Sequence, residues 1–165
     1  MQIRDERPQD IDSIYAITKA AFKTMPYSAG DEQDLINILR NDGALEVSLV
    51  AERGTEIIGH IAFSRVNIDG APGHWFDLGP VSVTPKLQSL GIGSALIRAG
   101  IERITAMGAE GCVLLGYPSY YGRFGFMHDP DLTYLGVANP NFQQLTIKGT
   151  TPKGDVHYHP AFQSA

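Results

Sequence analysis

A glycine–proline pair interrupts an otherwise regular strand just before a glycine-rich junction with a long helix. Residues 75–83 have the composition of an interior β-strand, yet Gly79 and Pro80 stand in its middle. Proline cannot donate to a sheet ladder and glycine weakens one, so the pair is typical of a bulge or of an edge strand. A bulge would bend the strand away from its neighbour and open a cleft, whereas an edge strand would only tolerate the proline. The strand alone leaves both interpretations open.

The residues after this strand have the character of an anion-binding site. Residues 91–107 carry an apolar stripe at helical spacing, and Gly91 and Gly93 stand at the start of that helix. Glycines let a backbone approach a ligand closely, and the first turn of a helix offers free N–H groups and a favourable dipole. A pyrophosphate is therefore the expected guest. The lysine of a P-loop and the third glycine of a dinucleotide fingerprint are absent.

The rest of the chain predicts a mixed α/β fold. Antiparallel strands precede a strand–helix–strand unit, which should form a right-handed parallel crossover. We therefore expect residues 1–165 to form a single domain, in which helices flank a mixed central sheet with splayed middle strands. The predicted helices cover residues 8–22, 32–40, 91–107 and 119–124, and the predicted strands cover 48–52, 57–66, 75–83, 112–115, 133–137, 145–147 and 155–158, with 67–73 as a loop.

Composition excludes several classes of protein. The 165 residues are 43% hydrophobic and 19% charged, which suits a packed core and not a disordered chain. No apolar run is long enough to span a membrane, and the N-terminus lacks the apolar stretch of a secretory signal. The single cysteine, Cys112, fits a reducing compartment, so we expect a cytoplasmic protein. A net charge of −5 argues against nucleic-acid and anionic-membrane partners and would tolerate a cationic substrate such as a polyamine or a lysine.

Two segments together resemble a known family. Val81-Ser82-Val83 followed by residues 88–93, Gln-Ser-Leu-Gly-Ile-Gly, resembles the signature of the GNAT N-acetyltransferase superfamily. Residues 116–126, Gly-Tyr-Pro-Ser-Tyr-Tyr-Gly-Arg-Phe-Gly-Phe, are similar to the later aromatic element of that superfamily, especially in its YhbS-like branch. The resemblance covers residues 1 to about 128. It departs from the branch at Tyr117, where an aspartate is common, and we expect that change to alter the acceptor pocket.

The resemblance implies acetyl-CoA as cosubstrate and an amine, on a small molecule or a peptide, as acceptor. The backbone of residues 81–83 would pair with the pantetheine arm, and the N–H groups of residues 88–94 would hold the pyrophosphate. Tyr121 matches the tyrosine that protonates the departing thiolate, and Asp77 lies where some members carry a catalytic glutamate. The residues expected to bind the cofactor are Val81, Ser82, Val83, Gln88, Ser89, Leu90, Gly91, Ile92, Gly93 and Ser94.

Each assignment has a plainer alternative. Tyr121 could simply pack in an aromatic cluster, and Asp77 could be an exposed carboxylate or a turn partner. The amine must lose a proton, and a water wire or one of the histidines could replace Asp77 as base. Cys112 lies in an apolar strand and is expected to be core, not a nucleophile. No metal-ligand spacing is present, so we expect no metal. The candidate histidines are His60, His74, His128, His157 and His159.

The favoured reaction is direct transfer in a ternary complex, in which a backbone N–H within residues 78–83 polarises the thioester carbonyl. One alternative is a non-catalytic acyl-CoA sensor with the same fold. Another is an unrelated phosphate-ligand module. A homodimer is compatible with the sequence, which does not define the oligomeric state or the acceptor.

Overall fold

A computed structural model describes residues 1–163, in which one eight-stranded sheet organises the chain. The main path of the sheet runs β1-β2-β3-β4-β5-β7, while β8 pairs with the far end of β3 and β6 pairs with β8. The β4–β5 and β6–β8 pairs are parallel and the others are antiparallel. The strands are β1 (Gln2–Asp5), β2 (Val47–Arg53), β3 (Glu56–Ile68), β4 (Ala71–Val83), β5 (Gly111–Leu115), β6 (Leu132–Tyr134), β7 (Phe142–Thr146) and β8 (Gly154–His157).

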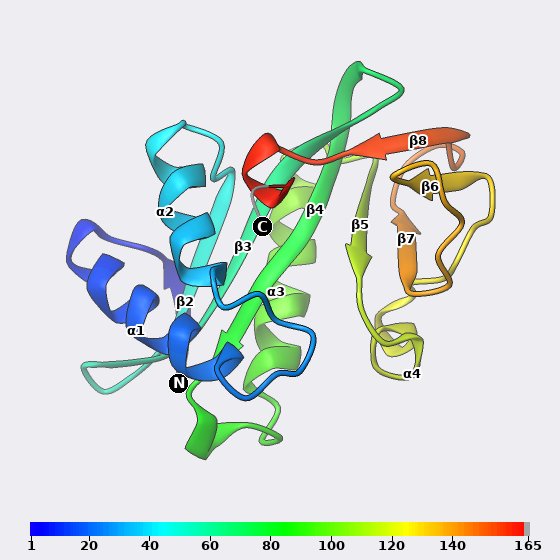
Figure 1. Cartoon of the computed structure of the whole chain (residues 1–165). Coiled ribbons are helices and arrows are strands. Elements are labelled where there is room, and N and C mark those ends of the chain that lie inside the picture. Colours follow the sequence, from blue (N-terminus) through cyan, green and yellow to red (C-terminus); the bar gives the residue numbers. More distant parts are fainter. Residues whose placement is uncertain (164–165) are drawn as a thin grey trace.

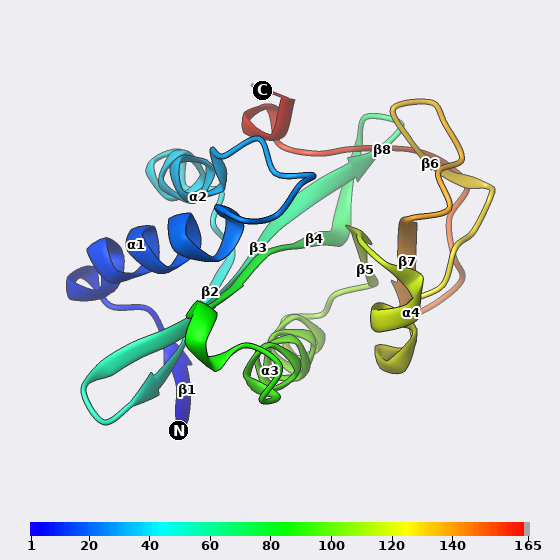
Figure 2. The same cartoon turned by 60° about the horizontal axis from the view of Figure 1, so that its bottom comes forward.

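Helices cover both faces of this sheet, as expected for the α/β class. Helices α1 (Ile11–Phe22) and α2 (Glu32–Asn41) lie on one face, and α3 (Ile92–Ala106) lies on the opposite face (Figures 1 and 2). The short helix α4 (Pro118–Tyr121) follows β5 and continues into a 3₁₀ turn, Gly122–Phe124. The prediction of a central sheet between helices is confirmed.

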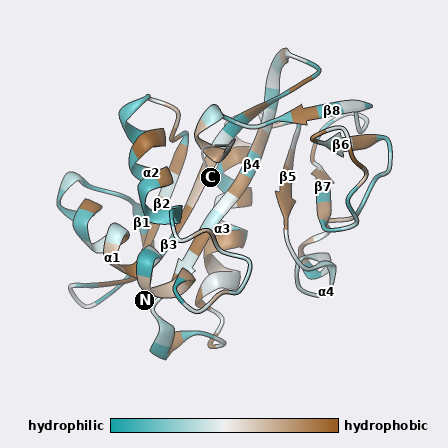
Figure 3. Cartoon of the chain, in the orientation of Figure 1, coloured by the Kyte–Doolittle hydropathy of each residue, from teal (hydrophilic) through white to brown (hydrophobic). Residues whose placement is uncertain are grey.

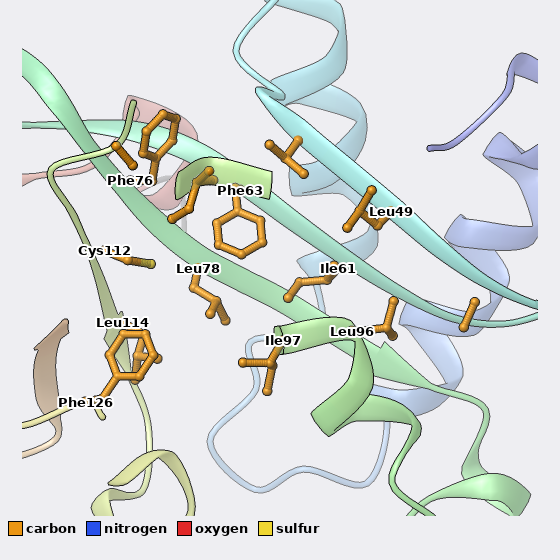
Figure 4. Close-up of a cluster of buried hydrophobic side chains, with 14 of the residues drawn as sticks. Leu49, Ile61, Phe63, Phe76, Leu78, Leu96, Ile97, Cys112, Leu114 and Phe126 are labelled. Carbon is orange, nitrogen blue, oxygen red and sulfur yellow. The ribbon is translucent and has the colours of Figure 1, made fainter. Parts of the chain in front are cut away.

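The main hydrophobic core lies between the sheet and α3. Figure 3 shows hydrophobic residues recurring along β5 and α3, and Figure 4 shows the side chains of this core in detail. Phe63, Leu96 and Cys112 are fully buried here, so the prediction of a core cysteine is confirmed. The helix approaches the sheet closely, because a Cβ on Gly100 would fall 2.3 Å from the Phe63 ring.

The central strands splay apart at the interrupted segment. Strand β4 pairs with β5 only from Trp75 to Asp77, and the two strands then diverge (Figure 1). Ile61 pairs with Val81 and Phe63 with Leu78, so one residue of β3 stands opposite two of β4. Both interpretations of the glycine–proline pair therefore hold in part. The pair forms a bulge in a central strand, and it stands where that strand has a partner on one side only.

The structure differs from the predicted elements in several places. The strands predicted at 133–137 and 145–147 are Leu132–Tyr134 and Phe142–Thr146. The predicted loop at 67–73 is a tight hairpin, because Asp69 and Gly70 both adopt positive φ angles, 52° and 80°, and Ile68 pairs with Ala71. This is the turn that best matches the twist of two antiparallel strands, so β3 and β4 extend through most of the predicted loop. The N-terminal strand β1 was not predicted, because four residues carry too little pattern.

Candidate functional site

The far end of β4 presents backbone groups that pair with no other strand toward the splay. The Thr84 N–H donates to the Ile58 carbonyl on β3 at 2.9 Å, so the preceding carbonyl, on Val83, points the opposite way. The Gln88 side chain donates to that carbonyl from the open side at 3.2 Å. Because backbone groups alternate along a strand, Val81 and Val83 direct their N–H and C=O groups away from β3. This edge can accept an extended ligand as an added strand.

Beyond β4 the chain turns sharply into α3. Ser89 and Gly91 adopt positive φ angles of 66° and 86°, and Gly91 occupies the N-cap position of α3. The first intrahelical bond runs from the Ala95 N–H to the Gly91 carbonyl. The N–H groups before Ala95 therefore have no partner in the helix and lie at the positive end of its dipole.

A cavity of about 550 Å³ adjoins this helix start, and we call it the Gly93 cavity. Seven of the ten residues expected to bind the cofactor line it. Ser82 is instead buried under α1, where its hydroxyl donates to Thr18 at 3.3 Å. Leu90 is 69% exposed and Ile92 packs in the core, so neither side chain lines the cavity. The seven lining residues are Val81, Val83, Gln88, Ser89, Gly91, Gly93 and Ser94.

Five further lining residues of the Gly93 cavity were not among the expected cofactor-binding residues, and they include Tyr120 and Arg123. Arg123 places a cation in the lining, and its guanidinium lies 4.5 Å above the ring of Tyr120. The Arg123 Nε also donates to the Tyr120 carbonyl at 2.8 Å. Arg123 belongs to the second family-like segment, so a search for cations within that segment would have found it.

A second cavity, of about 430 Å³, lies where β4 and β5 part, and we call it the Asp77 cavity. Asp77 and Tyr121, the two predicted catalytic residues, both line it. The two cavities share lining residues Phe22, Met25 and Val81. They are therefore neighbouring compartments, with the open edge of β4 between them.

Asp77 is buried, which contradicts its alternative interpretation as an exposed carboxylate. Asp77 is 3% exposed. It stands opposite Ser64 of the neighbouring strand β3, on the face of the sheet that α1 and α2 cover. Removal from water raises the pKa of this carboxyl to about 8, and the Tyr158 phenol beside it opposes part of the rise. The Tyr158 hydroxyl lies beside the Asp77 carboxyl, but it has no hydrogen-bond partner among residues 1–163. The two groups are therefore close without forming a hydrogen bond of good geometry.

Tyr121 was expected either to donate a proton or simply to pack in an aromatic cluster. In the structure it packs in such a cluster and also lines the Asp77 cavity. Its ring lies 5.0 Å from that of Tyr120 and 6.1 Å from that of Phe126. Burial raises the pKa of the phenol to about 12, with smaller contributions from its neighbours, including Tyr120 and Asp77. The phenol therefore keeps its proton far above neutral pH and can act as a donor.

Segments distant in sequence complete the Asp77 cavity. Tyr158 and Phe162 come from the C-terminal end, where the 3₁₀ turn Pro160–Gln163 contacts α2. His159 Nε2 lies 3.2 Å from Asp42 Oδ2, and this contact anchors the segment. Sequence reasoning missed these residues because the tail carries no family-like pattern.

The remaining candidate groups are separate from both cavities. His60 is fully buried, and its Nε2 lies 2.7 Å from the Ser48 hydroxyl. Cys112 is buried in the core, which raises the pKa of its thiol well above its usual range. Residues 1–163 contain no cluster of three or more potential metal ligands. None of the described helices is both long and apolar enough to cross a membrane.

Comparison with known proteins gives consistent matches. The family model described as "Acetyltransferase (GNAT) domain" matches residues 2–128. The "Uncharacterized N-acetyltransferase YhbS" of Escherichia coli K12 is 34% identical over 98% of both chains. A solved GNAT family acetyltransferase from Brucella melitensis, in complex with acetyl-CoA, is 46% identical over 98% of this chain and 97% of its own, with a TM-score of 0.88. The solved E. coli YhbS in complex with CoA is 30% identical, covering 98% of this chain and 91% of its own, with a TM-score of 0.89.

Proposed function

This chain belongs to the GNAT acetyltransferase family, and we propose that it transfers the acetyl group of acetyl-CoA directly to an amine on a small molecule or a peptide. We further propose that residues 1–165 act as one N-acetyltransferase domain. Lining residues of the Asp77 cavity come from positions as distant as Phe22 and Phe162, which supports one functional unit.

The Gly93 cavity is the proposed site of the cofactor. Solved relatives contain acetyl-CoA or CoA. Here the open edge of β4 would pair with the pantetheine arm, and the free N–H groups at the start of α3 would hold the pyrophosphate. Arg123 adds the positive charge that a helix dipole alone supplies only in part. The other three residues that were expected to bind the cofactor, Ser82, Leu90 and Ile92, would contribute only their backbone groups.

The observation that carries the proposal is the shared wall between the two cavities. A cofactor arm lying along Val81 and Val83 would deliver its thioester to the boundary of the Asp77 cavity. An acceptor in that cavity would then meet the thioester carbon in the presence of Asp77 and Tyr121. Two reactants held this way need no covalent acyl-enzyme.

The chemistry follows from the protonation states of these groups. In its deprotonated form, which predominates above its pKa of about 8, Asp77 takes a proton from the acceptor ammonium, and the freed amine forms a bond to the thioester carbon. The carbon–sulfur bond breaks, and Tyr121 gives its proton to the thiolate, so the products are CoA and an N-acetylated amine. A backbone N–H on the open edge of β4, most directly that of Val81, would stabilise the developing oxyanion.

The test is thiol release by Tyr121→Phe, which removes only the hydroxyl. Transfer should slow by roughly 10²-fold or more, the usual scale for loss of a general acid. Affinity for acetyl-CoA should stay unchanged, because the thioester sulfur is a poor hydrogen-bond acceptor. Tyr120→Phe is the matched control, since Tyr120 lines the Gly93 cavity and not the Asp77 cavity.

Four results would count against parts of the proposal. Damage confined to Tyr120→Phe would exchange the roles of the two tyrosines. Full activity in both variants would assign the proton to water or another group. Tight acetyl-CoA binding without transfer to any amine would identify the protein as an acyl-CoA sensor, and failure of CoA to compete better than ATP would remove the cofactor assignment.

A further inference from the structure

We propose that the acceptor is a compact primary amine that carries one aromatic ring, with the ring held by Tyr134, Tyr158 and Phe162. This inference rests on the proposed transfer reaction and names the substrate class of the same site. It follows from the charge, the aromatic walls and the limited size of the Asp77 cavity.

The charge of the Asp77 cavity favours a cation. Three acidic residues line it, Asp31, Glu32 and Asp77, and among residues 1–163 no lysine, arginine or histidine does. Burial raises the pKa of Asp77 to about 8, so Asp77 adds its full charge only above that pH. Glu32 accepts a hydrogen bond from the Ser28 hydroxyl at 2.6 Å, but neither Glu32 nor Asp31 takes part in an ion pair within the described chain. An ammonium group would therefore be concentrated in this cavity, whereas an anionic acceptor would be repelled.

Aromatic side chains make up one wall of the cavity. The rings of Tyr134 and Tyr158 lie 4.7 Å apart, and Phe162 meets Tyr158 at 5.2 Å and 80°. Phe142 stacks behind Tyr134 at 5.5 Å and 20°, which fixes the wall from the core side. Tyr134 and Phe162 are only half-buried, so part of their surface is open to a ligand. Such a surface suits an aromatic ring in offset or edge-to-face contact.

The position of the carboxylates favours one ammonium over two. Asp31 and Glu32 are half-buried at the start of α2, where water screens an ion pair and leaves it with little net stabilisation. Asp77 is the one buried carboxylate of the lining and is assigned to the reacting nitrogen. An aromatic ring against the wall of Tyr134, Tyr158 and Phe162 would lose its contact with water, and the apolar area buried there would stabilise its binding.

The size of the cavity favours a small molecule over a protein lysine. The loop between α1 and α2 closes one side, and its Tyr27 lies 6.1 Å from Tyr117 in an edge-on contact. Tyr117 belongs to the connection between β5 and α4, so this contact bridges the two sides of the splay. The cavity holds about 430 Å³, a volume that suits a compact amine.

Binding is tested apart from transfer, by calorimetry on the protein saturated with CoA, which cannot react. The probes are 2-phenylethylamine, n-butylamine, putrescine and a short lysine peptide. We expect 2-phenylethylamine to bind about tenfold more tightly than the others, since it alone adds a ring to the amine. Phe162→Ala should weaken it about tenfold, and Phe162→Tyr should restore it. Both variants should retain their affinity for CoA, which verifies folding.

Equal or tighter binding of putrescine or of the peptide would overturn the aromatic assignment, and so would unchanged affinity in Phe162→Ala. Thiol release separates this inference from the proposed function. Selective binding of 2-phenylethylamine with no acetylation would support the inference and count against transfer. Acetylation of putrescine or the peptide, with 2-phenylethylamine inert, would leave the transfer reaction standing and remove the inference.

Discussion

Gly116 lies directly against the ring of Tyr121, and a Cβ at position 116 would fall 2.5 Å from Tyr121 Cε2. The backbone there has little freedom to move away. The Gly116 N–H donates to the Asn141 carbonyl at 3.0 Å, and the Gly116 carbonyl accepts from the Gln143 side chain, also at 3.0 Å. The missing side chain at Gly116 therefore sets the position of the Tyr121 ring.

Gly116→Ala should displace Tyr121 and slow transfer. A shift of about 1 Å in a reacting group can cost two orders of magnitude in rate, so we expect a loss of tenfold or more. Acetyl-CoA affinity, measured by calorimetry, should stay the same because Gly116 lies outside the Gly93 cavity. Gly122→Ala is the matched control, since it has helical φ, −55°, and open space around its Cβ. Equal activity of both variants would show that the ring position is not critical.

Gly93→Glu should weaken acetyl-CoA binding by about tenfold or more, because the new carboxylate would face the pyrophosphate. Gly93 is the cleaner position for this test. Gly91 has a φ of 86°, so any side chain there strains the backbone, whereas a Cβ on Gly93 meets only ordinary contacts at 3.7 and 3.8 Å. Gly93→Gln has the same shape without the charge, and a loss equal to that of Gly93→Glu would assign the effect to bulk alone.

The sequence predicts the cofactor half of the site better than the acceptor half. The interruption at Gly79 and Pro80 and the glycines at the start of α3 are local features, and local backbone demands can be inferred from a few adjacent residues. The wall built by Tyr134, Tyr158 and Phe162 depends on a tail that folds back onto α2. Such long-range packing leaves no periodic pattern in the tail itself.

The burial of Asp77 could not be predicted from the sequence, for a different reason. Its place in a strand could be predicted, but its burial could not, because polar residues usually mark the exposed face of a strand. Here the face that carries Asp77, Ser64 and His60 is covered by α1 and α2. The polar residues of this face therefore lie inside the protein, and their pKa values follow from tertiary packing.

His60 should make the protein less stable as the pH falls from about 7 to 4. Burial lowers the pKa of its imidazole from 6.5 to about 4, and the attraction of Glu6 offsets only part of this effect. Between these values the unfolded chain takes up a proton that the native protein does not, so acidification favours unfolding. Arg40 also opposes a second cation here, although its guanidinium is held by Glu6 at 2.8 Å.

Thermal unfolding of the wild type and of His60→Gln, measured between pH 7 and 5, checks this expectation. The glutamine keeps a polar group near the Ser48 hydroxyl but cannot titrate. Its unfolding temperature should be lower at pH 7, because a buried side chain has been replaced, but it should fall less steeply with acidification. Parallel curves for the two proteins would place the acid sensitivity elsewhere, for example at Glu6.

Asp77→Asn should stabilise the fold while it slows transfer. Burial raises the pKa of the carboxyl from 3.8 to about 8, so between these values the native protein holds a proton that the unfolded chain has released. Stability therefore declines as the pH rises through this window, and asparagine, which cannot ionise, avoids the loss. The advantage of Asp77→Asn should be absent near pH 4 and reach about a few kcal/mol near pH 8, an estimate from 1.36 kcal/mol per pKa unit. Thermal unfolding at several pH values measures this difference in stability.

At pH 8, thiol release by Asp77→Asn should fall roughly 10²-fold, because no group remains to accept the ammonium proton. A stabilised variant with full activity would make Asp77 a structural residue, whereas an inactive and stabilised one would show that the carboxylate is kept at the expense of stability.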